Sequence, residues 1–155
     1  MKYQEANDKD AEEVALVLKE CYNIDSIEEG ADVFNSERKN DHNYITAVDE
    51  GKVIGLATWK IHGLPKHGLC ELDRIAVLPD YRGKGIAKEL FNALIKAASE
   101  AYKKKGLKLR KLYILTHADN KRAQAFYEKM GLKHETTLKS HYYHDKDELV
   151  YSMFF

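Results

Sequence analysis

Apolar residues recur along this chain with two periods, one typical of strands and one typical of helices. Positions 44–48 and 53–61 are β-rich runs, and the Asp-Glu-Gly segment 49–51 between them predicts an antiparallel hairpin. A third strong run, 69–78, ends where Pro79 removes a backbone donor. The complete pattern predicts strands at 1–6, 44–48, 53–61, 69–78, 111–116, 133–140 and 148–155.

Four other segments are predicted to be helices. The first places apolar side chains at i, i+3, i+4 and i+7, namely Val14, Val17, Leu18 and Cys21. Asp8 or Asp10 is expected to cap this helix, and Ser26 a second helix that runs to about Arg38. A third helix follows Gly85 with an apolar face formed by Ile86, Leu90, Phe91, Leu94, Ile95 and Ala98, and a fourth covers 120–130.

The order of these elements is β-α-α-β-β-β-α-β-α-β-β. Strands that alternate with helices in this way, together with hairpins, predict an α/β fold with one mixed sheet. With 155 residues and no repeat or linker, residues 1–155 are expected to form a single domain.

Charge and composition limit the class of partner. Lys plus Arg and Asp plus Glu both number 25, and the isoelectric point is about 7.1, so the basic excess of a nucleic-acid binder is missing. Neither an apolar run of about 20 residues nor a signal peptide is seen, so we expect no membrane partner and a cytoplasmic location. Cys21 and Cys70 lack zinc-like spacing, so they are expected to be reduced core residues, and no metal is expected.

The turn between the third strong strand and the long helix carries two glycines, Gly83 and Gly85. Backbone N–H groups at such a turn, leading into a helix N-terminus, can form a concave donor site for a pyrophosphate. The third glycine of a dinucleotide fingerprint is absent, and GxxxxGK[ST] does not occur. NAD and ATP are therefore poor candidates for the ligand.

The wider context of this turn resembles the GCN5-related N-acetyltransferase (GNAT) superfamily. Its acetyl-CoA signature, [Q/R]-x-x-G-x-[G/A], is matched by Arg82, Gly85 and Ala87. A second block of the family, N-x-x-A-x-x-F-Y-x-K-x-G-[F/L], is matched by Asn120, Ala123, Phe126, Tyr127, Lys129, Gly131 and Leu132. The resemblance runs from about Tyr44 to the C-terminus.

This resemblance implies acetyl-CoA as cosubstrate and a set of residues that bind it. The amides of residues 83–87 would cradle the pyrophosphate, residues 76–78 would pair with the pantetheine arm, and the strands at 69–78 and 111–116 would splay apart to admit the thioester. The cofactor-binding residues implied are Ile75, Ala76, Val77, Leu78, Arg82, Gly83, Lys84, Gly85, Ile86, Ala87, Asn120 and Tyr127.

Transfer of an acetyl group to an amine requires a base, because an alkylammonium with a pKa of about 10.4 is almost entirely protonated at pH 7. Glu71 and Asp73 lie two apart on one strand and so share a face. The family places an acidic base at either spacing from Arg82, so both remain candidates. His117 is a third candidate, for which an exposed loop histidine is the alternative interpretation.

The departing thiolate of coenzyme A benefits from a proton donor, and the resemblance assigns this role of general acid to Tyr127. In isolation, Phe126 and Tyr127 would be interpreted as core aromatics of their helix. Cys70 lies on the opposite strand face from Glu71, so packing is favoured over a role as nucleophile.

The acceptor amine remains open between two classes. The segment 141–147 resembles the paired-tyrosine hairpin of protein N-terminal acetyltransferases, which favours a peptide amine. Acidic residues at 25–32, with Asp145, Asp147 and Glu148, favour a cationic small amine such as a polyamine or amino sugar, or are solvated surface. The alternative function is a noncatalytic acyl-CoA sensor that kept the cradle without the chemistry. A homodimer is a possible assembly for either function.

Overall fold

A computed structural model describes residues 1–155 and contains seven strands, which form a mixed sheet in the order β1-β2-β3-β4-β5-β7-β6. The strands are β1 (Lys2–Glu5), β2 (Asn43–Asp49), β3 (Lys52–Ile61), β4 (Leu69–Val77), β5 (Lys111–His117), β6 (Lys133–Tyr143) and β7 (Lys146–Phe154). The helices are α1 (Ala11–Cys21), α2 (Ile27–Lys39), α3 (Ile86–Lys104) and α4 (Lys121–Lys129), with short 3-10 turns η1 (Asp8–Asp10), η2 (Pro65–His67) and η3 (Pro79–Tyr81). The predicted α/β class and element order are confirmed.

The chain divides into two compact units. The first unit contains residues 1–60 and 73–101, and the second unit contains residues 61–72 and 102–155. The boundary falls inside β4, after Leu72, and inside α3, after Ala101. Both of these elements therefore contribute residues to each unit.

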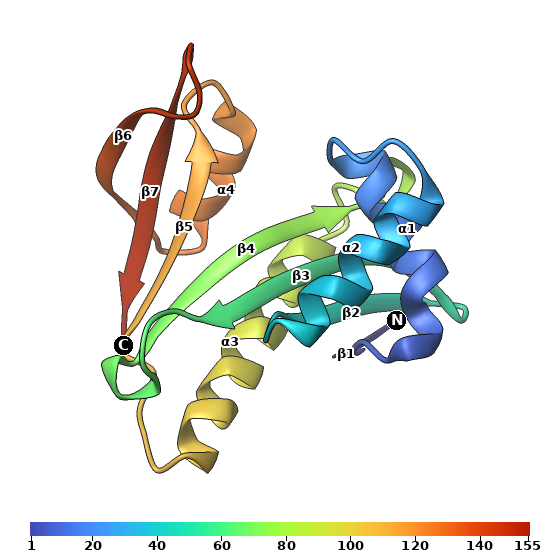
Figure 1. The fold of residues 1–155 in the computed structure, drawn as a ribbon, viewed down its shortest axis with the longest axis horizontal. Coiled ribbons are helices and arrows are strands. Elements are labelled where there is room, and N and C mark those ends of the chain that lie inside the picture. The colour runs from blue at the N-terminus through green and yellow to red at the C-terminus, as the bar shows by residue number, and fades with distance from the viewer. The chain divides into compact units, whose positions relative to one another are not determined.

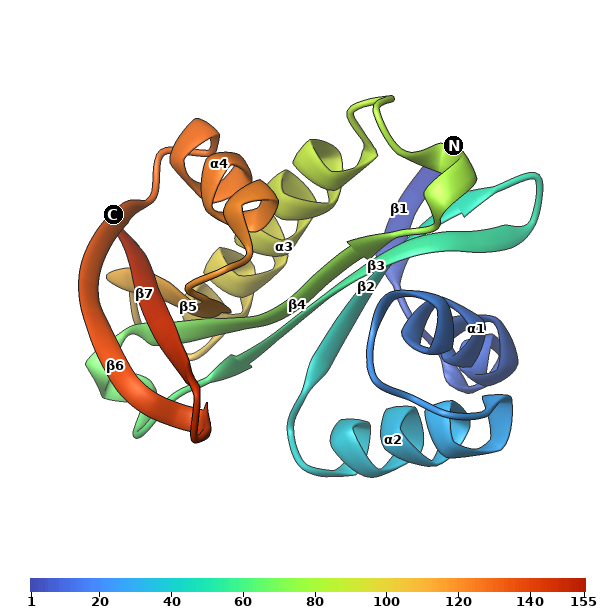
Figure 2. The same cartoon turned by 90° about the horizontal axis from the view of Figure 1, so that it is seen from above.

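In the first unit, antiparallel strands β1, β2 and β3 lie between two helical layers. Figure 2 shows α1 and α2 on one face of these strands and α3 on the other. The core on the α1 and α2 side consists of Val14, Val17, Leu18, Phe34, Tyr44, Val53 and Leu56. The apolar face that the spacing predicted for the first helix is therefore the face that packs into this core.

The two N-terminal helices begin at different kinds of cap. Ser26 accepts a hydrogen bond from the Glu29 amide at 3.0 Å, which confirms it as the cap of α2. Asp10 occupies the N-cap position of α1, as expected, but its side chain makes no capping hydrogen bond to that helix. It instead closes a reciprocal capping box with Asn7, which caps the preceding turn η1. This 3-10 turn feeds directly into α1 at Ala11 and supplies the capping bonds before the α-helix begins.

In the second unit, β5 pairs antiparallel with β7, and β7 pairs antiparallel with β6 (Figure 1). The first residues of β4, Leu69 to Glu71, pair in parallel with β5. Helix α4 follows β5, and its Tyr127 ring contacts Tyr151 on β7 at 6.1 Å between centroids. Figure 1 shows α4 beside β5 and β7.

The final hairpin is longer than the sequence pattern predicts. Strand β6 continues to Tyr143 and β7 begins at Lys146, so most of segment 141–147 belongs to the hairpin. The register shifts between Leu138 and Tyr143, and Ser140 has a positive φ of 45°. Tyr143 pairs with Lys146 at the tip, and the Asp147 carboxylate accepts a hydrogen bond from the Ser140 amide at 3.0 Å. These contacts hold an extension that carries no hydrophobic alternation for a sequence pattern to detect.

Candidate active site

The glycine turn in the first unit has the local geometry of a phosphate cradle. Gly83 and Gly85 have φ values of 77° and 79°, a region in which side chains are strained. Nothing lies within 4 Å of a Cβ built on either residue, so the space beside this backbone is open. Helix α3 begins at Ile86, immediately after the turn, so its N-terminal amides face the same region.

The Arg82 side chain turns back onto the end of β4. Its Nε donates to the Val77 carbonyl at 2.9 Å, and its Nη2 lies 3.8 Å from Cys21 Sγ. This contact holds the glycine turn against the strand that precedes it. Lys84 instead places its ammonium 5.3 Å from the centroid of the Tyr81 ring, a cation–π contact at the turn.

Backbone groups near the end of β4 are held by neighbouring elements. The Tyr22 hydroxyl donates to the Ile75 carbonyl at 3.1 Å, and the Leu78 amide donates to Ile54 on β3 at 2.9 Å. Burial raises the pKa of Tyr22 above its usual range, so this hydroxyl remains a donor across the physiological pH range. The backbone path at Ile75, on β4, and at Leu78, just after β4, is thus restrained before any ligand binds.

Asp73, also in the first unit, takes part in an ion-pair network. Its Oδ2 lies 3.3 Å from Arg74 Nη1 and 3.8 Å from His42 Nε2. The same Arg74 nitrogen donates to both carboxylate oxygens of Glu37, at 2.8 and 2.7 Å. Burial lowers the pKa of Arg74, but the hydrogen bonds and charges of Glu37 and Asp73 outweigh it and raise the pKa overall. Asp73 is therefore an ion-paired carboxylate.

Glu37, His42 and Asp73 place one potential metal-ligand atom each within 4.8 Å of one another. The Arg74 guanidinium already contacts both carboxylates of this cluster. A divalent cation at the same place would have to compete with that positive charge. The cluster is therefore an ion-pair network around Arg74.

Glu71 lies in the second unit, and its contacts differ from those of Asp73. The Tyr113 hydroxyl donates to Glu71 Oε2 at 3.1 Å, and His62 Nδ1 lies 3.6 Å from the same oxygen. Glu71 and Tyr113 are register partners in the parallel pairing of β4 with β5. The side chain of Glu71 is 14% exposed. Glu71 is therefore a largely buried carboxylate that accepts a hydrogen bond from a phenolic hydroxyl.

His117 forms a close pair with a buried carboxylate. It is the last residue of β5 and the register partner of Glu148 on β7, and its Nδ1 is hydrogen-bonded to Glu148 Oε1. Glu148 is only 2% exposed. The interpretation of His117 as a loop histidine was therefore wrong, as was that of Glu148 as solvated surface. Strand pairing brings the two together and orients the imidazole.

Tyr127 and Asn120 belong to α4 and its cap. Tyr127 is 5% exposed, and its ring lies 5.7 Å from that of Phe126. The Asn120 side chain accepts a hydrogen bond from the Ala123 amide at 3.1 Å and so caps the helix. Gln124 donates to the carbonyls of His117 and Ala118 at 3.2 and 2.9 Å, which fastens α4 to the end of β5. Tyr127 is thereby held in a defined place.

Cys70 is fully buried, which confirms its assignment to the core. Burial raises the pKa of its thiol to about 12, and the charge of Glu71 acts in the same direction. A thiol with this pKa carries almost no thiolate at neutral pH and is a poor nucleophile. Cys21 is likewise in no disulfide and is partly buried against the α1 and α2 core.

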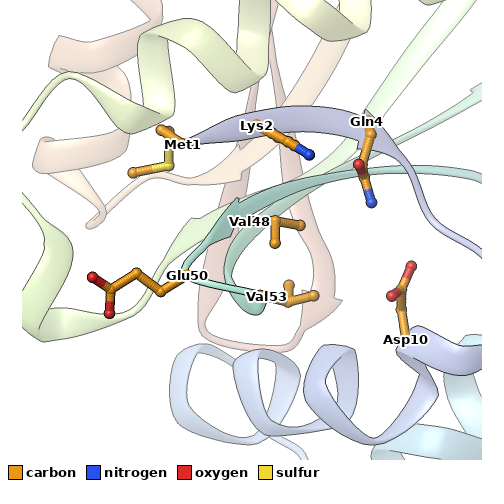
Figure 3. A pocket seen from close by; sticks show the side chains of 8 residues that line it. Met1, Lys2, Gln4, Asp10, Val48, Glu50 and Val53 are labelled. Atoms are coloured by element: carbon orange, nitrogen blue, oxygen red, sulfur yellow. The ribbon is translucent and has the colours of Figure 1, made fainter.

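A hollow of about 410 Å³ lies in the first unit, away from these residues. Figure 3 shows Lys2, Gln4, Asp10 and Glu50 around it. None of the residues predicted to bind acetyl-CoA lines this hollow. It contains none of the acid or base candidates either, so it does not coincide with the predicted active site.

Sequence patterns did not predict His62 and Tyr113, which the fold brings to Glu71. One signal was present in the alternation of β5, where Tyr113 shares a strand face with His117 while Leu112 and Ile114 are buried on the other. No comparable signal marks His62, since it follows β3 in a loop-like context. The predicted residues Arg82 to Ala87 lie in the first unit, and Glu71, Asn120 and Tyr127 lie in the second.

These features agree with the comparison to known protein families. Residues 11–132 match the acetyltransferase (GNAT) family, which covers most of the chain, and the chain belongs to this family. An uncharacterized N-acetyltransferase of Escherichia coli, YjgM, is 37% identical over 93 residues, covering 60% of this chain and 52% of that protein. Another from Methanocaldococcus jannaschii is 29% identical over 106 residues, covering 66% of this chain and 44% of its own length. The chain thus spans about half the length of the curated relatives it matches.

Solved structures of the same fold cover nearly the whole chain. An aminoglycoside 6'-N-acetyltransferase complexed with coenzyme A has a TM-score of 0.81 and 15% identity, covering 99% of this chain and 97% of its own. The ribosomal-protein-S18-alanine N-acetyltransferase of Escherichia coli has a TM-score of 0.78 and 19% identity, covering 99% and 92%. At these identities the likeness establishes the fold. No helix of the chain combines the length and apolarity needed to cross a membrane.

Proposed function

We propose that this protein is an acetyl-CoA-dependent N-acetyltransferase that transfers the acetyl group directly to a primary amine. The observation that carries the proposal is the open glycine turn at the start of α3, in a chain of the GNAT family. A turn with free space beside its backbone and helical amides behind it suits a pyrophosphate. The coenzyme A complex of the aminoglycoside enzyme supports this choice of cosubstrate.

In the proposed binding mode, amides of residues 83–87 cradle the pyrophosphate and residues 75–78 pair with the pantetheine arm. The contact of Arg82 with Val77 supports this mode, because it holds the turn and the strand end together before binding. Asn120 would contribute through its amide group near the pantetheine, beside its role as helix cap. The splaying of β4 from β5 stays a prediction.

The proposed reaction needs no covalent enzyme intermediate. Glu71 removes a proton from the substrate ammonium, and the amine nitrogen forms a bond to the thioester carbonyl carbon. The tetrahedral intermediate then collapses with cleavage of the carbon–sulfur bond. Tyr127 supplies a proton to the departing thiolate, and the phenolate regains a proton as the amide nitrogen loses its extra one. The products are then the neutral amide and coenzyme A, and Glu71 keeps the one proton released. A backbone amide near Ala76 would stabilise the oxyanion.

The contacts favour Glu71 over Asp73 as the base. Asp73 lies beside the Arg74 guanidinium, and a nearby cation makes a carboxylate a weaker base. Glu71 is largely buried and receives a hydrogen bond from a neutral hydroxyl. His117, oriented by buried Glu148, is the remaining candidate if Glu71 proves dispensable.

Two acceptor classes remain in the proposal. Exposed Tyr142 and Tyr143 on the β6–β7 hairpin favour a peptide amine, because exposed aromatic rings suit contact with an extended chain. Similarity of fold to an aminoglycoside enzyme is equally compatible with a small polyamine or amino sugar. We further propose that residues 1–155 act as one domain. We also propose a cytoplasmic location, which is supported by two cysteines that form no disulfide.

The experiment is an assay of free thiol released from acetyl-CoA over a panel of amines. The panel should contain polyamines, an aminoglycoside, lysine derivatives and peptides with free N-termini. We expect amine-dependent thiol release with at least one class, and formation of the matching amide by mass spectrometry. Binding of acetyl-CoA without turnover on any amine would support the noncatalytic sensor instead.

A further inference from the structure

Three side chains of the second unit form a continuous chain from Glu71 to solvent. The Tyr113 hydroxyl donates to Glu71 Oε2 at 3.1 Å and lies 2.8 Å from His62 Nδ1. Glu71 is 14% exposed, whereas the His62 side chain is 53% exposed. The hydrogen-bonded chain therefore leads from a largely buried carboxylate to an imidazole in contact with water.

The fold supplies the three side chains from two neighbouring strands and from the residue that follows a third strand. Tyr113 lies on β5 directly beside Glu71 of β4, as their register shows. The His62 amide donates to the Leu69 carbonyl at 2.9 Å, which holds the end of β3 next to β4. The rings of His62 and Tyr113 meet edge to face at 5.7 Å. Backbone pairing thus maintains the geometry independently of the side chains.

We propose that Tyr113 and His62 carry the proton captured by Glu71 out to solvent during each turnover. The inference rests on the proposed function, in which Glu71 removes a proton from the substrate amine. Without an exit path, the protonated carboxyl group could not act as a base in the next cycle.

The transfer consists of two proton movements that occur together. Protonated Glu71 gives its proton to the Tyr113 oxygen while the Tyr113 hydroxyl gives its own proton to His62 Nδ1. The resulting imidazolium then releases a proton to water or buffer, and exchange with water resets the tautomer. Glu71 returns to the carboxylate, Tyr113 stays neutral, and one proton has left the site.

The direction of transfer follows from ordinary acidities. A carboxylic acid is ordinarily a stronger acid than an imidazolium, so the proton moves from protonated Glu71 toward His62. Burial, and then the charge and hydrogen bond of Glu71, raise the pKa of Tyr113 above its usual range. The hydroxyl therefore relays by exchange and does not become tyrosinate.

Two further ionisable groups that raise the pKa of Tyr113 stay neutral near pH 7. They are Cys70 of β4 and Tyr142 of β6, both of which act on Tyr113. Burial raises the pKa of Cys70 to about 12, and a phenol ionises at about pH 10. Within the relay itself, His62 supplies the imidazole, the side-chain group that most readily exchanges protons near neutral pH.

The test compares His62→Ala, Tyr113→Phe and the double variant in dilute buffer at pH 7, with the best amine of the panel. We expect kcat to fall on the order of tenfold in each single variant, less than the 10²–10⁴ of a lost general base. The double variant should be no slower than the slower single variant, because either change interrupts the same path. His134→Ala is the matched control, because His134 is an exposed histidine on β6 that takes no part in the relay. This variant should keep the wild-type kcat.

Imidazole added at constant pH and ionic strength distinguishes a relay from mere positioning. It should restore kcat of His62→Ala toward the wild-type value and leave wild type and His134→Ala unchanged. Wild-type kcat for His62→Ala, or a deficit that imidazole never restores, would overturn the relay. The Glu71→Gln variant distinguishes failure of the proposed base from failure of the relay. Wild-type activity of Glu71→Gln would overturn Glu71 as the base, whereas an inactive Glu71→Gln together with a fully active His62→Ala would overturn the relay alone. If the wild-type protein acetylates no amine, both the proposed function and the relay are overturned.

Discussion

Arg74 on β4 and Glu37 on α2 form an ion pair in which one guanidinium nitrogen contacts both carboxylate oxygens, at 2.7 and 2.8 Å. The Tyr44 hydroxyl adds a 2.5 Å hydrogen bond to the same carboxylate. The pair ties a helix of the N-terminal region to the strand that carries Asp73. It is mostly buried, with side-chain exposures of 22% and 17%.

Glu37→Gln should destabilise the protein because it removes the charge that compensates Arg74. The loss should be about 1–3 kcal/mol, between the values for exposed and buried ion pairs. Urea denaturation measures it. Lys139→Gln, which removes an exposed ion pair with Asp147, is the control and should leave the urea midpoint unchanged. Equal midpoints for wild type and Glu37→Gln would show that the pair contributes nothing to stability.

Gly85→Val should weaken acetyl-CoA binding, because a branched side chain fills the open space beside the turn. Acetyl-CoA at 100 times its Kd should stabilise wild type by about 2.7 kcal/mol, seen as a higher Tm, and ATP and NAD should do much less. Gly106→Val is the matched control, since Gly106 also has a positive φ, 69°, and open space but lies at the end of α3. Equal Tm shifts in both variants would count against the cradle.

Glu71→Gln should lower kcat/KM on the order of 10²–10⁴ near neutral pH, because it removes the proposed base. The deficit should shrink as the pH rises and the amine loses its proton without help. Asp73→Asn should have a much smaller effect, since Asp73 lies in the Arg74 ion-pair network. Rate profiles from about pH 6 to 10 test this, and a larger loss in Asp73→Asn would reverse the assignment.

Tyr127→Phe keeps the ring and removes the hydroxyl proposed to protonate the thiolate. We expect kcat and kcat/KM to fall together on the order of 10²-fold, about 2.7 kcal/mol, with acetyl-CoA affinity nearly unchanged. Tyr151→Phe is the control, because it removes a nearby buried hydroxyl that donates to Glu128 at 3.1 Å. A folded Tyr127→Phe protein with wild-type turnover would remove this residue from the mechanism.

Alkylation should distinguish the two cysteines in the folded protein. Burial raises the pKa of Cys70 to about 12, so its thiolate fraction at pH 8 is about one in ten thousand. Iodoacetamide should therefore modify half-buried Cys21 first, as mass spectrometry of peptides can show. Because the folded pKa exceeds the ordinary value, the stability that Cys70 contributes is complete below about pH 9 and is lost toward pH 12. Equal labelling rates at pH 8 would contradict this burial effect.

The order of elements and the glycine turn could be predicted from the sequence because their causes are local. Period-two and helical spacing predicted every strand and all four α-helices, and Ser26 was recognised as a cap. The two family blocks around Gly85 and Tyr127 identified the family that the comparison then showed. These signals lie within a few neighbouring residues, where propensity and burial act directly.

The partners of the charged and polar groups were decided by tertiary structure alone. Glu148 looked like solvated surface, yet strand pairing buries it against His117, 31 positions away. Glu71 and Asp73 were equivalent in the sequence, and only the fold brings Tyr113 to one and Arg74 to the side of the other. An ionisable side chain takes its role from burial and from charges within a few ångströms. Those neighbours come from distant segments, so no local pattern of the sequence specifies them.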